Sequence, residues 1–309
     1  MSSIRTEFLP MLKIAVPVVM AELGWMTMGV VDTVMVGPLG PEAISAAGVG
    51  NSMHIAFAIF GMAVMLGLDT LVSQAYGARN IRDCHRWFFD GLMLAGLLAV
   101  PIMTLLVLVW FAIPSLGFHG AVRPLIESYF GVLLLSTPFL LAYAVCRRYL
   151  QAMHAATPVM FALVTANVIN AGGNWVLVYG HLGFPALGVA GSAWATVISR
   201  AYMLSALLFA VWWIDRKRTR EAGIAGHGLW HVDRAFRAVR VRTLLRLGLP
   251  AASQMGAEVG VFALATALAA RLDAVSSASH QIALNIVSLV FMVPLGLASA
   301  GAVRVGHAI

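Results

Sequence analysis

Long apolar segments separated by short polar connections make up most of the chain. Each segment holds about 20 apolar residues, the length that an α-helix needs to cross the hydrocarbon core of a bilayer. The segments lack the alternation of polar and apolar residues that is typical of strands in a membrane barrel. We therefore predict an all-α polytopic membrane protein with about eight transmembrane helices, near residues 14–36, 51–75, 88–113, 125–146, 157–179, 187–214, 244–270 and 279–303.

Composition supports this prediction. The 309 residues are 61% hydrophobic and 11% charged, and the mean hydropathy is +0.88. A soluble domain is about half apolar and one quarter charged, so the surplus of apolar side chains is best explained by contact with lipid. The first segment follows a short basic lead, but it is long and carries Glu22, which favours a retained helix over a cleaved signal peptide.

The net charge of +7 raises the question of nucleic-acid binding. The positions of the basic residues argue against it, because they gather in alternate connections between the predicted helices. This is the positive-inside pattern, and it places both termini in the cytoplasm. The residues concerned are Arg79, Arg82, Arg86, Arg147, Arg148, Arg216, Lys217, Arg218, Arg220, Arg234, Arg237, Arg240 and Arg242.

Residues 215–243 form the longest polar segment and have the highest density of charge. Val232, Phe236 and Val239 within it share one face of a helix, a spacing that suits a helix lying in the membrane interface. We predict a cytoplasmic linker that joins an N-terminal lobe, residues 1–214, to the start of a second lobe, residues 244–309. An ordinary cytoplasmic loop is the alternative.

An internal repeat supports this division. Residues 11–26 resemble 244–259, and residues 42–67 can be aligned with 273–298, at an offset of 231–233. Six predicted helices separate the copies, so both copies cross the membrane in the same direction, as in the parallel repeats of some transporters. The second copy reaches only two helices before Ile309, so we expect a fragment of a protein with about four more helices. A complete eight-helix protein is the alternative.

Asp32 interrupts an apolar run, GVVDTVMVG, where a carboxylate costs about 2.5–3.5 kcal/mol on insertion scales. Asn170 and Asn174 lie four residues apart and share a helix face, and Thr196 follows in the next predicted helix. Carboxylate, amide and hydroxyl oxygens suit Na⁺-like cations, and membrane carboxylates also serve proton transfer. From spacing alone, ion binding and helix–helix hydrogen bonding are equally open for Asp32. For the asparagines, helix–helix bonding is favoured.

Other polar and aromatic residues in the predicted helices complete the set of candidates. Glu22 lies about 15 Å along the helix from Asp32, too far to share one small site. Pro17 removes a backbone hydrogen bond and predicts a bend. Trp25, Phe57, Phe60 and Tyr143 could contribute to an adaptable substrate wall of aromatic and methionine side chains, and the alternative is that they face lipid or pack against other helices. Glu22 and Gln281 are further cavity candidates; a structural role is equally open for Glu22, and helix capping or packing is favoured for Gln281.

Several motifs resemble those of the multidrug and toxic compound extrusion (MATE) transporters, in particular the bacterial branch named for norfloxacin resistance. They are VDTVMVG, TLVSQAYGA, NVINAGGNW, PALGVAGSAWAT and SASHQIALNIVSLVFMVPLGLASAGAVRVG, and the resemblance spans essentially the whole chain. It implies two six-helix lobes in a bacterial inner membrane. It also implies export of cationic or amphiphilic compounds in exchange for Na⁺ or H⁺ by alternating access, with no other cofactor.

The resemblance also implies individual roles. Asp32 matches the coupling carboxylate of the first lobe, and Asn170, Asn174 and Thr196 match its polar partners, so Na⁺ could bind among these four residues. Glu258 matches a carboxylate of the second lobe. The later helices of that lobe, which carry another carboxylate, have no counterpart in this sequence.

Three other functions are less well supported by the sequence. A flippase for lipid-linked precursors would have a cationic cavity, whereas the embedded charges identified above are acids. An intramembrane enzyme would need paired Asp-rich motifs or HExxH, and the sequence has neither. The repeat and the embedded carboxylates argue against a receptor or structural protein. We therefore expect a transporter rather than an enzyme, with no nucleic-acid partner; the oligomeric state is left open.

Overall fold

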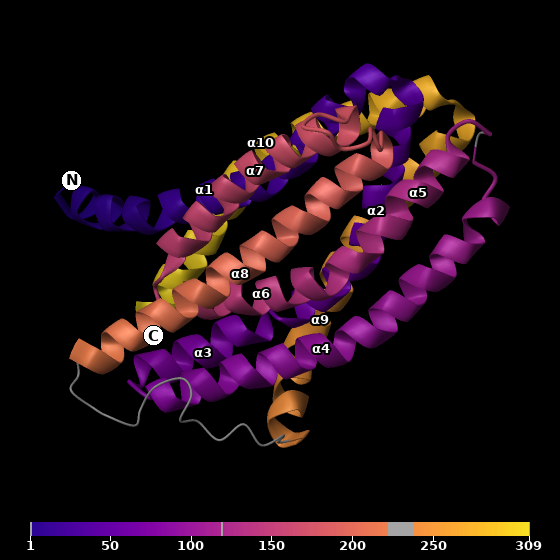
Figure 1. Ribbon diagram of the computed structural model, residues 1–309. Helices are drawn as coiled ribbons and strands as arrows, with labels where there is room; N and C mark the ends of the chain where they lie inside the picture. The colour runs from indigo at the N-terminus through magenta and orange to yellow at the C-terminus, as the bar shows by residue number, and fades with distance from the viewer. Residues whose placement is uncertain (1, 119, 222–237, 309) are drawn as a thin grey trace.

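The computed structural model describes the backbone of residues 2–118, 120–221 and 238–308, and the regular structure of these residues is helical (Figure 1). Eight helical stretches within these residues are long and apolar enough to cross a membrane, which confirms the predicted all-α polytopic class. Two stretches consist of two helices each, α2 with α3 and α5 with α6. The helices are α1 (Ser2–Val36), α2 (Pro41–Val64), α3 (Gly67–Gly77), α4 (Ile81–Ala112), α5 (Arg123–Leu133), α6 (Thr137–Ala152), α7 (Ala156–Tyr179), α8 (Val189–Glu221), α9 (Ala238–Leu272) and α10 (Ala274–Ala308).

The predicted span 51–75 begins too late, because α2 already starts at Pro41. The first turns of α2 consist largely of buried Ala, Gly and Ser. Such small residues contribute little hydropathy, but they allow other helices to approach closely. The prediction missed them because it followed hydropathy alone.

The fourth predicted span ended too early, at residue 146, since α6 continues to Ala152. Arg147 was expected in a cytoplasmic connection, but it lies inside α6 and is buried. Its guanidinium forms an ion pair with the Glu22 carboxylate of α1. A buried charge is tolerated when it is paired, and a linear sequence does not show that these two residues meet.

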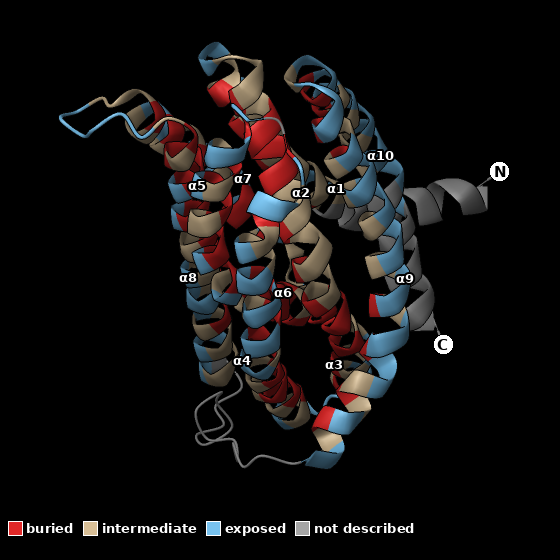
Figure 2. Ribbon diagram, turned by 90° about the vertical axis from the view of Figure 1, so that its right-hand side faces the viewer, coloured by how far each residue is buried: buried red, intermediate tan, exposed pale blue. Residues whose placement is uncertain are grey.

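Apolar side chains cover the outer surface of the bundle, while the polar residues of the site lie inside it. Figure 2 shows the buried residues concentrated between the helices and exposed faces along α8, α4 and α9. On α4, a stripe of apolar side chains at helical spacing is more than half exposed: Leu97, Val100, Leu108 and Phe111. This distribution is expected where lipid replaces water as the solvent of the outer face.

The last two helices pack against the first two in exchanged order. α1 lies along α10, and α2 lies along α9. In the sequence repeat, α9 is the counterpart of α1 and α10 the counterpart of α2, so each helix contacts the counterpart of its neighbour. Ser45 of α2 donates a 2.6 Å hydrogen bond to Ser277 of α10, 232 residues further along the chain. A two-fold relation between the copies would produce this arrangement.

The two ends of the predicted linker are helical, because α8 continues to Glu221 and α9 begins at Ala238. Residues 222–237, with Val232 and Phe236 of the predicted interfacial face, lie outside the described residues. The beginning of α9 is held against α4 by Arg240. Its guanidinium contacts Asp90 at 2.6 Å and Asp83 at 3.0 Å, and it lies 3.7 Å from the ring centroid of Trp87.

Helices α7 and α8 approach each other closely, and glycines allow it. A Cβ on Gly191 of α8 would lie 2.4 Å from the Leu177 carbonyl oxygen of α7, and a Cβ on Gly173 would lie 3.1 Å from the Ala195 Cβ. Gly172, the preceding residue on α7, faces open space. This close approach sets the spacing between the polar residues of α7 and α8.

We expect Gly191→Ala to lower the thermal unfolding midpoint in detergent, because the new methyl group must push α8 away from the α7 backbone. Overpacking of this kind costs about 1–3 kcal/mol. Gly172→Ala is the matched control and should leave the midpoint unchanged or raise it, since alanine favours helix by up to about 1 kcal/mol over glycine. Equal midpoints for the two variants would contradict the close contact.

Candidate ion-binding site

Asp32 lies near the end of α1, where its side chain is 7% exposed. Two residues further on, Val34 is 66% exposed. Successive helical residues are about 100° apart, so these two side chains lie on nearly opposite faces of α1. The helix therefore presents its apolar side outward and directs the carboxylate into the bundle.

Three side chains from two other helices donate hydrogen bonds to this carboxylate. Asn170 and Asn174 of α7 donate through Nδ2 to Oδ1 of Asp32, at 3.0 and 2.8 Å. The Thr196 hydroxyl of α8 donates to Oδ2 at 2.8 Å. All four side chains are buried. Hydrogen bonds to an ionised acceptor are about twice as strong as neutral ones, so the cluster stabilises a negative charge inside the bundle.

The cluster also contains unused acceptors. The Oδ1 atoms of Asn170 and Asn174 are buried and have no hydrogen-bond partner among the described residues. Buried polar atoms are normally paired, and an unpaired one is a candidate ligand for an ion or water. Together with the Asp32 carboxylate and the Thr196 hydroxyl, these atoms are the hard oxygen donors that suit Na⁺. The same carboxylate can take a proton, so the donor set fits either ion.

Glu258 is not part of this cluster. It lies on α9 with an exposed side chain, and the structure gives it no hydrogen bond or ion pair with any described residue. Its role in ion coupling stays a prediction.

Glu22 contributes to a different cluster, between α1 and α6. Its carboxylate pairs with Arg147, and one turn further along α1 the Trp25 ring stacks parallel to that of Tyr143, with centroids 6.1 Å apart. Tyr143 is fully buried. These contacts explain the three residues as packing between α1 and α6, and a role in substrate binding stays a prediction.

Phe57 and Phe60 line a cavity of about 340 Å³ between α2, α4 and α9. Its other walls are mostly aliphatic, formed by Ala56, Ile102, Leu105, Ala252, Ser253 and Gly256. Gln281 does not line this cavity. It lies on α10 against Gly48 of α2 and donates a 3.3 Å hydrogen bond to Asn285.

The predicted bend at Pro17 concerns the first part of α1. This helix is continuous from Ser2 to Val36, and Figure 1 shows that it changes direction toward its N-terminal end. Whether Pro17 acts as a hinge stays a prediction.

The sequence analysis missed buried basic residues near the site. Arg200 of α8 is 4% exposed and donates through Nη1 to the Ser136 hydroxyl at 2.5 Å. His54 of α2 is fully buried and lies 3.1 Å from the Thr137 hydroxyl. The spacing between Thr196 and Arg200 was the available signal, because residues four apart share a helix face.

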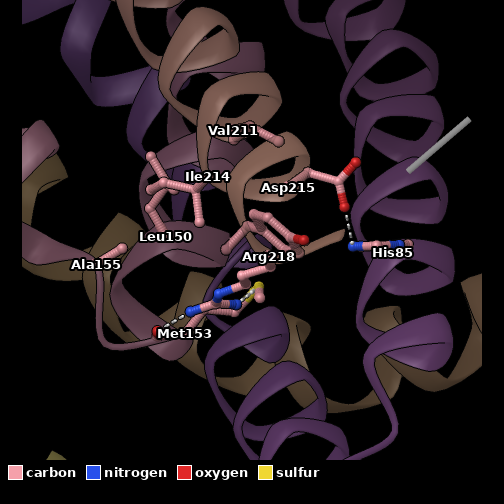
Figure 3. A pocket seen from close by; sticks show the side chains of 9 residues that line it. His85, Leu150, Met153, Ala155, Val211, Ile214, Asp215 and Arg218 are labelled. Carbon is pink, nitrogen blue, oxygen red and sulfur yellow. Dashed lines mark hydrogen bonds and ion pairs between the residues drawn. The ribbon is translucent and has the colours of Figure 1, made fainter. Parts of the chain in front are cut away.

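A further polar cluster lies toward the other end of α8 (Figure 3). His85 of α4 is 3.2 Å from the Asp215 carboxylate, beside a cavity of about 10 Å³. Asp215 is about 28 Å further along α8 than Thr196, at 1.5 Å per residue. The cavity has room for about one water, so it is a packing feature separate from the Asp32 cluster.

Comparisons with known proteins agree with this architecture. The MatE family model matches residues 17–176. The chain is 35% identical over 311 residues to the probable multidrug resistance protein NorM of Mesorhizobium japonicum, covering 98% of this chain and 64% of that protein. It is 32% identical over 303 residues to the protein of the same name from Bradyrhizobium diazoefficiens, covering 98% and 63%.

A solved structure shows the same fold. It is described as the inward-facing conformation of a multidrug resistance MATE family transporter of the MOP superfamily, and it superimposes with a TM-score of 0.74 at 21% identity. The match covers 89% of this chain and 60% of that one. The chain thus spans less than two thirds of the length of these relatives. Since the family model covers about half of the chain, from α1 into α7, the chain belongs to the MatE family.

Proposed function

We propose that this chain carries the ion-coupling lobe of a secondary antiporter that exports cationic or amphiphilic drugs in exchange for Na⁺ or H⁺. The observation that carries the proposal is the buried Asp32 carboxylate, which holds three donated hydrogen bonds beside two unpaired amide oxygens. The names of the relatives, multidrug resistance proteins, support the substrate class. The proposed location is the bacterial inner membrane, with a cytoplasmic N-terminus.

Ion binding would act on the packing of α1 against α7 and α8. In the structure, Asn170, Asn174 and Thr196 turn their donor groups toward Asp32. A bound cation needs oxygen ligands, so the two amides would turn their Oδ1 atoms toward it. A ligand shifts a conformational equilibrium only by its difference in affinity for the two states, and the exchange of donors for acceptors supplies such a difference.

The coupling then follows from alternating access. With the site open outward, the ion neutralises Asp32, the lobe repacks and the drug leaves. With the site open inward, a drug cation replaces the ion. The cavity beside Phe57 and Phe60 would hold the apolar part of the drug, because its volume of about 340 Å³ lies within the range of small-molecule pockets.

A flippase for lipid-linked precursors is less well supported. Arg147 and Arg200 show that the buried charges are not all acids, as the sequence analysis had assumed. However, Arg147 is neutralised by Glu22, and Arg200 acts electrostatically on Asp32. Neither provides the free positive charge that a pyrophosphate needs. The proposed activity is transport, with no covalent chemistry and no cofactor besides the coupling ion.

Asp32→Asn is expected to reduce ion-driven drug efflux to the level of cells without the transporter, because the amide carries no charge for the ion to neutralise. Efflux is measured as drug release driven by a Na⁺ or proton gradient, using the protein encoded by the complete native reading frame. Glu127→Gln is the control, since among the described residues the ion pair of Glu127 is with the neighbouring Arg123 on α5. Unchanged efflux in Asp32→Asn would refute the proposed function.

Asn174→Ala and Thr196→Val are expected to weaken Na⁺ binding by about 10- to 150-fold each, because each removes an oxygen ligand of the proposed site, and an interaction with a charged group contributes about 1.5–3 kcal/mol. Binding of Na⁺ to the purified protein is measured by isothermal titration calorimetry. Thr196→Ser, which retains the hydroxyl, should stay close to the wild type. An equal loss in Thr196→Ser and Thr196→Val would show that the hydroxyl is not the important group.

The cavity can be tested by filling it. Gly256→Leu places a side chain beside Phe60, whose Cδ2 atom would lie 3.8 Å from the new Cβ, whereas Gly260 faces open space one turn further along α9. We expect Gly256→Leu to reduce transport of bulky drugs at least several-fold while ion binding is unchanged, and Gly260→Leu to transport normally. Equal transport by both variants would exclude this cavity from the substrate path.

A further inference from the structure

Arg200 places a second buried charge on the face of α8 that carries Thr196. The two residues are one turn apart, about 6 Å along the helix axis, and Thr196 donates directly to Asp32. The guanidinium is 4% exposed, so water does not screen it. Asp32 and Arg200 are therefore both buried beside Thr196: Asp32 of α1 accepts its hydrogen bond, and Arg200 follows it by one turn on α8.

Arg200 has no directly bonded carboxylate. Its Nη1 atom donates to the Ser136 hydroxyl, and its Nε atom is buried without a hydrogen-bond partner among the described residues. Within that part of the chain, Asp32 is the carboxylate that acts on Arg200, and Arg200 is the cation that acts on Asp32.

Two neighbouring arginines show the usual arrangement. Arg147 binds Glu22 directly, and Arg148 contacts Asp69 at 3.1 Å. Both carboxylate oxygens of Asp32 instead accept hydrogen bonds, from Asn170, Asn174 and Thr196. Arg200 thus interacts with Asp32 by long-range electrostatics. Its guanidinium does not take up the hydrogen-bonding positions of the carboxylate.

We propose that Arg200 is the resident counter-charge of Asp32, a tethered cation that stabilises the ion-free carboxylate and weakens the binding of the coupling ion. Its buried guanidinium makes the ion-free pair neutral, and a bound Na⁺ or H⁺ adds a net positive charge to the pair. Repulsion from Arg200 then lowers the affinity for the ion and speeds its release. The inference rests on the proposed ion coupling at Asp32, and it assigns Arg200 as a positioning residue that sets the affinity of that site.

The test measures ion binding to the purified protein by calorimetry with Na⁺ alone, in the wild type, Arg200→Gln, Arg200→Lys and Arg148→Gln. At an effective dielectric constant of about 20, removing one charge several ångströms away should tighten binding by about 10- to 100-fold. Arg200→Lys keeps the charge and should stay within about threefold of the wild type. Arg148→Gln removes a charge paired elsewhere and should have no effect. If the wild type does not bind Na⁺, proton binding is titrated instead, and the variants are expected to rank in the same order of affinity.

Transport separates this role from a merely structural one. If Arg200 promotes release, Arg200→Gln should lower both the KM for the ion and kcat. A structural defect would lower kcat without tightening the ion site. Unchanged or weaker ion binding in Arg200→Gln overturns the inference and leaves the proposed function intact, provided that Asp32→Asn abolishes binding. Persistent binding in Asp32→Asn overturns the proposed function itself.

Stability supplies a second measurement that does not depend on the identity of the ion. Arg200→Gln leaves Asp32 as an uncompensated buried charge, so we expect it to unfold at a lower temperature than the wild type. The double variant Arg200→Gln with Asp32→Asn removes both charges and should recover part of this loss. If Arg200→Gln does not fold, recovery of folded protein in the double variant supports the pairing. No recovery overturns it.

Discussion

The hydrogen bonds to Asp32 are the interaction on which the arrangement of α1, α7 and α8 depends. One carboxylate from α1 is held by two amides from α7 and a hydroxyl from α8. An ionised group without these donors would be prohibitively expensive inside an apolar bundle. The packing of these helices is also reversible, because a proton or cation that neutralises Asp32 removes the negative charge to which the three donors bind. A site of this kind holds three helices together and can also release them.

Other buried and partly buried charges in the bundle are also stabilised by partners from other helices, but by direct ion pairs. Glu22 with Arg147 joins α1 to α6, and Arg240 with Asp83 and Asp90 joins α9 to α4. In these pairs a guanidinium is in direct contact with a carboxylate oxygen. Asp32 differs in that its counter-charge acts from a distance while neutral groups fill its hydrogen-bonding positions. That difference separates a candidate coupling site from a structural ion pair.

Much of the site could be predicted from the chain. The i, i+4 pair Asn170 and Asn174, the buried position of Asp32 and the hydroxyl of Thr196 were all visible as polar residues in apolar segments. Their meeting could not be predicted from spacing, because it depends on how α1 crosses α7 and α8. Arg200 was not predicted as a site residue. It lies near the middle of a predicted span, and its burial in the structure shows that it faces the interior.

The sequence by itself determined that the protein is an α-helical membrane protein, because lengths of apolar residues set the number of helices that can span a bilayer. It also determined the repeat and the chemistry of the candidate ligands. Only the tertiary structure decided which charges are paired. It placed Arg147 on Glu22 and left Glu258 outside the cluster, and it set Ser45 against Ser277 where the two copies meet. The physical reason is that a buried charge is stabilised by partners from other helices, and these partners become neighbours only when the helices pack.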